Sequence, residues 1–171
     1  GVLLVTVAGC EKTWVFALIA SVLFYDYIHK KWAGGIIIMG GCRFFLWLVA
    51  ATAAGKSELA PQSLIWASVL ASYIIGISWF ARGESRKKTE PVQYSIILLF
   101  SNPLITLALL VYWNQLDPIR VFLCNLTGLL VAWIAFSSIL LMREEKKGAI
   151  GKGVSQLLAG ICALDATALS F

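Results

Sequence analysis

Long apolar stretches follow one another along this chain, and the loops between them alternate between strongly basic and nearly neutral. The stretches are about 17–25 residues long, the length that crosses the ~30 Å hydrocarbon core of a bilayer. Ten of the 14 Lys and Arg residues fall in one set of loops, three fall in the other, and Arg43 lies inside an apolar stretch. Because short cytoplasmic loops carry an excess of Lys and Arg, the pattern predicts an integral membrane protein whose basic loops, residues 29–32, 82–90 and 143–152, are cytoplasmic.

Each spanning segment is expected to be a helix, because an isolated strand cannot satisfy its backbone hydrogen bonds in lipid. The predicted fold is therefore all-α: a polytopic transmembrane helix bundle in a single domain over residues 1–171, with about six spans and the tail of an earlier helix. The chain begins at Gly1 and ends at Phe171 inside apolar runs, so we expect a piece of a longer protein, truncated at both ends. The expected spans are residues 13–28, 35–54, 61–81, 92–113, 118–142 and 154–171.

Composition supports a membrane protein over a soluble nucleic-acid-binding one. Hydrophobic residues make up 60% of the chain, charged residues 13%, and the mean hydropathy is +0.84. The formal net charge of +5 would suit nucleic acid, but the cations lie in short loops between spans, so no nucleic-acid partner is expected. The four cysteines are scattered without CxxC spacing, which predicts neither a disulfide framework nor a metal site.

The first candidate site is the run Tyr25–Lys31, at the basic end of the first complete span. Asp26, His29 and Lys30 stand at positions i, i+3 and i+4, so they share one helix face. A carboxylate beside cations at a membrane interface suits the binding of a metal–diphosphate head group. The same residues also suit a basic helix end whose long side chains reach the interface. The spacing alone leaves both interpretations open.

Arg43 is the second candidate, because it lies well inside the next span. An arginine at that depth is costly unless it faces a partner or a water-filled cavity. Asp165 lies at a comparable depth in the last span and is a candidate counter-ion, and Asn125 is another polar candidate. Arg43 is therefore either half of a buried ion pair or a contact for an anion in a cavity.

The third candidate is the predicted loop Arg82–Lys88, which has one carboxylate, Glu84, among four cations. This set suits a phosphate group better than it suits chelation of a metal cation. It is also simply the largest basic loop of the chain. The mixed charges of Arg143–Lys147 predict only a solvated, self-neutralising loop.

The run YDYIHKKWAGGIIIMGGCR at residues 25–43 resembles the UbiA-type intramembrane prenyltransferases. In that family a span ends with an aromatic residue and a basic pair, and the next span begins at a turn of small residues. Residues 71–85 (ASYIIGISWFARGES) look like the span and loop that carry the family's second aspartate-rich motif, and residues 153–166 (GVSQLLAGICALDA) are similar to the last helix of a bacterial UbiA-like subgroup. The resemblance implies that the chain runs from the end of helix three to helix nine of a nine-helix bundle in a bacterial plasma membrane.

The resemblance further implies transfer of a prenyl group from an isoprenoid diphosphate to an aromatic or other lipophilic acceptor. In that family Mg²⁺ bridges the diphosphate and two aspartate-rich motifs. By position, the basic pair of the family falls on His29 and Lys30, and the second acidic motif falls on residues 81–85. The residues expected to bind the diphosphate are His29, Lys30, Arg43 and Arg82, and those expected to bind Mg²⁺ are Glu84 and Asp26.

Two departures from the family pattern leave other functions open. The first aspartate-rich motif would precede Gly1, and the second is reduced to one acid in Ala81–Ser85. The 171 residues alone are therefore expected to be inactive. A second hypothesis is a UbiA-like protein that has lost catalysis and binds or moves an isoprenoid lipid. A third, an unrelated transporter, would line a path with intramembrane charges and show inverted repeats, whereas the sequence offers only Arg43 and Asp165 and no repeat.

Overall fold

The computed structural model of the protein describes residues 9–29, 32, 34–53, 59–85, 108, 117–143 and 149–169. Every element in these ranges is a helix, as the sequence predicts, and none of the described residues forms a strand. The chain divides into two compact units, Gly1–Ile75 and Gly76–Phe171. The predicted span 92–113, apart from one helical residue at 108, lies outside the described residues, and the single-domain organisation stays a prediction.

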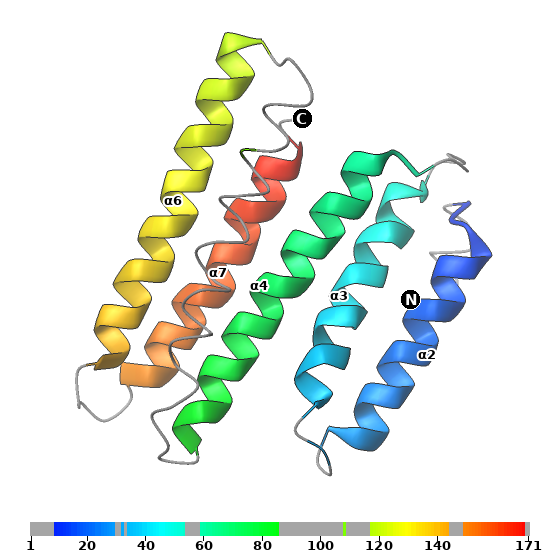
Figure 1. Ribbon diagram of the computed structural model, residues 1–171, viewed down its shortest axis with the longest axis horizontal. Coiled ribbons are helices and arrows are strands. Elements are labelled where there is room, and N and C mark those ends of the chain that lie inside the picture. Colours follow the sequence, from blue (N-terminus) through cyan, green and yellow to red (C-terminus); the bar gives the residue numbers. More distant parts are fainter. Residues whose placement is uncertain are drawn as a thin grey trace. The chain divides into compact units, whose positions relative to one another are not determined.

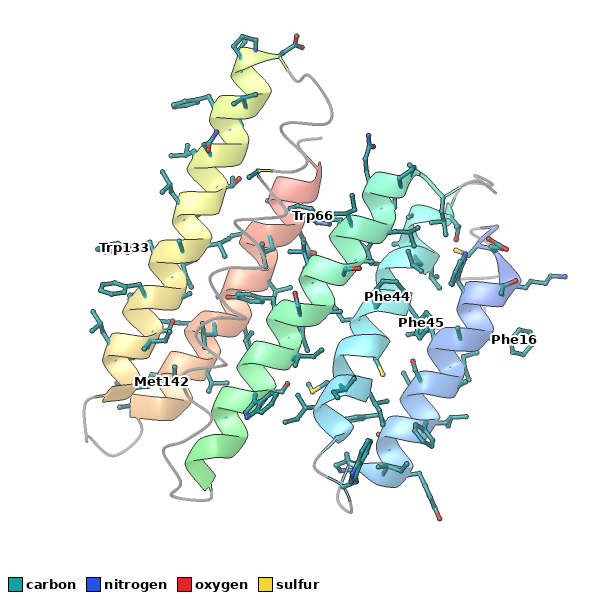
Figure 2. The ribbon with its side chains drawn as sticks, viewed as in Figure 1. Phe16, Phe44, Phe45, Trp66, Trp133 and Met142 are labelled. Atoms are coloured by element: carbon teal, nitrogen blue, oxygen red, sulfur yellow. The ribbon has the colours of Figure 1, made fainter. Side chains whose placement is uncertain are left out.

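The first unit contains a helical hairpin of α2 (Lys12–Ile28) and α3 (Gly35–Ala51), which lie side by side (Figure 1). The ring of Trp14 on α2 stacks on Phe45 of α3, with centroids 6.4 Å apart. Figure 2 shows Phe45 on the side of α3 that faces α2, and Phe16 on the side of α2 that faces away from α3. At the end of the hairpin far from the turn, the backbone N–H of Glu11 donates to Thr52 Oγ1 at 3.4 Å. An aromatic pair and a cap contact thus help to join the two helices.

Helix α4 (Pro61–Ser85), whose part up to Ile75 belongs to this unit, packs there against α3 at a glycine. A Cβ built on Gly40 of α3 would lie 2.6 Å from Ile75 Cγ1 and 3.0 Å from the carbonyl oxygen of Ala71, both on α4. Only a residue without a Cβ allows this approach, which is a common device where helices pack in membranes. Helix α4 begins at Pro61, which confirms the predicted start of this span. A proline fits there because its missing N–H is not needed in a first helical turn.

The second unit pairs α6 (Pro118–Arg143) with α7 (Ala149–Leu169), which lie side by side (Figure 1). A glycine again allows the close contact: a Cβ on Gly153 of α7 would lie 2.7 Å from Met142 Sδ and 3.0 Å from the carbonyl oxygen of Ser138. The hydroxyl of Ser138 donates to the carbonyl of Ile134 at 2.6 Å and also lies 3.2 Å from Gln156 Oε1 on α7. The buried residues of α7 repeat every three or four positions, as an amphipathic helix requires; they are Ala149, Gly153, Leu157, Gly160 and Leu164.

Two described helices are long and apolar enough to cross a membrane: the segment Pro61–Trp79 of α4 and the segment Val121–Met142 of α6. Helices α2 and α3 have 17 residues each and span about 26 Å at ~1.5 Å per residue, slightly less than a bilayer core.

The outer face of α6 is apolar and exposed, with Trp133 pointing away from α7 (Figure 2). Large apolar side chains on this face recur at alternating spacings of three and four: Ile119, Phe122, Leu126, Leu129, Trp133, Phe136 and Leu140.

Several helix boundaries differ from the sequence prediction. Helix α4 continues through residues 82–85 and α7 begins at Ala149, so parts of the predicted basic loops 82–90 and 143–152 are helical. Arg, Glu and Lys form helices readily, so the backbone can stay helical beyond the end of an apolar stretch. Helix α3 ends at Ala51, three residues earlier than predicted, where the buried hydroxyl of Thr52 donates to the carbonyls of Leu48 and Val49.

Candidate functional site

The turn between α2 and α3 carries the residues of the first predicted site that the structure describes. Helix α2 ends at Ile28, and His29 follows as the C-cap residue with helical backbone angles. The backbone N–H of His29 donates to the carbonyl of Tyr25 at 2.8 Å. His29 therefore lies one helical turn beyond Tyr25, on the same side of the helix. Lys30 and Lys31, which follow, lie outside the described residues.

The imidazole of His29 is held by a ring contact and by backbone carbonyls. Its ring stacks on the ring of Tyr25, with centroids 5.1 Å apart and planes 22° apart. Its Nδ1 lies 3.2 Å from the carbonyl oxygen of Tyr25 and 3.0 Å from that of Asp26. A carbonyl oxygen can only accept a hydrogen bond, so Nδ1 carries the hydrogen in these contacts. Any other partner of the ring nitrogens must therefore meet the imidazole at Nε2.

The contact between Asp26 and His29 uses the backbone carbonyl of Asp26. The sequence instead predicts a role for the Asp26 carboxylate, as a metal ligand beside the cations. The Asp26 side chain is exposed in the last turn of α2. A carboxylate there lies at the negative end of the helix dipole, where an acid is unfavourable and a cation is favourable. Local helix stability therefore explains the position of His29 better than it explains that of Asp26.

The turn that follows is closed by Trp32 and Gly34. The backbone N–H of Trp32 donates to the carbonyl of Ile28 at 3.0 Å, and its own carbonyl accepts from the N–H of Gly35 at 3.3 Å. The indole of Trp32 lies against Gly34 so closely that a Cβ on Gly34 would collide with the ring. The small residue after the basic pair is thus needed for the tryptophan to fold over the turn. The indole remains 57% exposed, which suits a membrane interface.

Arg43 lies inside α3, one helical turn beyond Gly40, and its side chain is partly buried. The predicted counter-ion Asp165 and the predicted polar partner Asn125 belong to the second unit, on α7 and α6. The exposed amide of Asn125 donates to the carbonyl of Val121 at 2.8 Å on its own helix. The pairing of Arg43 with either residue stays a prediction.

The remaining predicted residues lie at the end of α4. The backbone at Arg82 and Glu84 is helical, and their side chains are outside the described part of the structure. Their roles as diphosphate contact and metal ligand therefore stay predictions. Among the described residues, no three His, Cys, Asp or Glu side chains gather in a group that could hold a metal ion. Asp26 is the one predicted magnesium ligand whose side chain is described, and these residues do not by themselves form a magnesium site.

This chain matches no protein-family model, no curated protein and no solved structure. The resemblance to UbiA-type prenyltransferases thus rests on the residues of the sequence.

Sequence reasoning did not single out two features of this site. The first is the contact of Tyr25 with His29, although a spacing of four residues between an aromatic residue and a histidine on a helix was a signal for it. The second is the contact of Trp32 with Gly34. No sequence rule predicts that contact, because the direction of the indole depends on the path of the turn.

Proposed function

We propose that this chain is part of an intramembrane prenyltransferase of the UbiA type, which moves a prenyl group from an isoprenoid diphosphate to a lipophilic acceptor. The observation that supports it most is the basic end of the α2–α3 hairpin. There His29, whose Nδ1 lies within hydrogen-bond distance of two backbone carbonyls, precedes two lysines at the end of an apolar helix pair. The junction between apolar helices and a basic turn suits a ligand that has an apolar tail and an anionic head group.

In the proposed reaction, the bond between C1 of the allylic chain and the diphosphate oxygen breaks, and the diphosphate leaves with the electron pair. The acceptor then forms a bond to C1 and releases a proton. Cations at the site stabilise the charge that grows on the leaving diphosphate, and apolar helix walls keep water from the allylic cation. We assign the first task to Lys30 and to the protonated form of His29, which carries a positive charge and has an Nε2–H to donate, with Arg43 and Arg82 as further contacts for the anion.

A divalent cation would supply charge neutralisation for the diphosphate when bound. Of the two proposed ligands, Asp26 is the one whose side chain the structure describes, and no three His, Cys, Asp or Glu side chains gather among the described residues, so we derive no step through the metal. We retain Mg²⁺, with Glu84 and Asp26 as ligands, as a separate proposal that the experiment below also tests.

One observation favours a second function, the binding or movement of an isoprenoid lipid without transfer. The segment Ala81–Ser85 holds a single acid, Glu84, where the prenyltransferases carry two or more aspartates. A protein with this segment would keep its cationic contacts for the diphosphate and lose its hold on the metal. The two functions therefore differ in whether binding depends on Mg²⁺ and on Glu84.

The test measures the affinity of the detergent-purified protein for geranylgeranyl diphosphate, with and without Mg²⁺. Removing one charged contact to a phosphate, in Lys30→Ala or His29→Ala, is expected to weaken binding about tenfold or more. The matched control is Lys12→Ala, an exposed lysine at the other end of α2, which should leave the affinity unchanged. Glu84→Ala should weaken binding only in the presence of Mg²⁺.

Each outcome decides between the functions. Binding that requires Mg²⁺ and falls in both Lys30→Ala and Glu84→Ala supports the prenyltransferase. An affinity that is lower in Lys30→Ala, and that changes neither with Mg²⁺ nor in Glu84→Ala, supports the lipid-binding protein. Equal affinities of Lys30→Ala, His29→Ala and Lys12→Ala contradict both, because the cations at the turn would then have no part in holding the diphosphate.

A further inference from the structure

We draw no further inference here: the strongest candidate, the exposed stripe of small side chains along α7 (Gly151, Ser155, Ala159, Cys162 and Ala166), suits the close approach of another helix, and nothing in the part of the chain that the structure describes shows what covers it.

Discussion

Gly40 and Gly41 are adjacent on α3 and should respond in opposite ways to the same substitution. A Cβ on Gly41 meets nothing within 4 Å, whereas a Cβ on Gly40 would lie 2.6 and 2.8 Å from two carbons of Ile75. Ordinary contacts between carbon atoms begin at about 3.5 Å, so the side chain of Ile75 would have to retreat by about 0.9 Å. The carbonyl oxygen of Ala71, at 3.0 Å from the new Cβ, belongs to the backbone of α4 and cannot move without moving the helix.

The magnitude follows from two terms. Replacing glycine by alanine inside a helix stabilises it by roughly 0.5–1 kcal/mol, and this term is shared by the two variants. Overpacking costs about 1–3 kcal/mol, and only Gly40→Ala carries that cost. The free energies of unfolding of the two variants should therefore differ by about 1–3 kcal/mol, with Gly41→Ala more stable than the native protein.

The assay is reversible unfolding in mixed micelles, followed by circular dichroism at increasing mole fractions of a denaturing detergent. A double variant that combines Gly40→Ala with Ile75→Ala is a further check, since shortening Ile75 removes its contacts with the new methyl group and should recover part of the loss. Equal stabilities of Gly40→Ala and Gly41→Ala would refute the close approach of α3 to α4 at this point.

Three further predictions concern the rest of the fold. Gly153→Val should destabilise the α6–α7 pair by about 1–3 kcal/mol relative to Gly151→Val, because a Cβ at position 151 meets nothing within 4 Å. The micelle unfolding assay measures this difference. Equal losses of unfolding free energy in the two variants would contradict the contact of Gly153 with Met142. Leu129→Arg, on the exposed face of α6, should oppose insertion of that helix by about 2.5–3.5 kcal/mol in a glycosylation-mapping assay, whereas no effect would argue against a lipid-facing α6. Thr52→Val should lower the free energy of unfolding, measured by thermal unfolding, by about 0.5–1.5 kcal/mol. Thr52→Ser should lower it less, because serine keeps a hydroxyl that can accept from the backbone N–H of Glu11.

The sequence predicted the helices well where one physical signal dominated. Pro61 and Pro118 begin α4 and α6 as expected, because proline fits a first helical turn. The apolar stretches gave the positions of five helices to within a few residues, because backbone groups in an apolar segment must be bonded within the helix. Boundaries were less well predicted where a helix continues past its apolar stretch, as at Ser85, since the charged residues there are good helix formers and hydropathy does not detect them.

The roles predicted for the site residues stay predictions, and the structure adds local geometry to them. The spacing of Asp26 and His29 predicted that both lie on one face at the end of the first span, where α2 ends at Ile28 and His29 is its C-cap residue. Nothing in the sequence predicted the contact of His29 with the Asp26 carbonyl, which forms because a donor at a helix C-terminus finds unpaired carbonyls nearest to it. The fold of the Trp32 indole over Gly34 depends on the path of the turn, and no residue pattern encodes that path locally.

Whether the basic end of the α2–α3 hairpin holds an isoprenoid diphosphate is tested most directly by photocrosslinking. An isoprenyl diphosphate analogue with a photoreactive group next to the diphosphate would be irradiated with the protein in membranes, and the labelled residues identified by mass spectrometry. Labelling within residues 25–34 that excess geranylgeranyl diphosphate suppresses is the predicted result. Labelling confined to the other end of the hairpin, around Lys12 and Thr52, or labelling that excess diphosphate does not suppress, would contradict a diphosphate site at this turn.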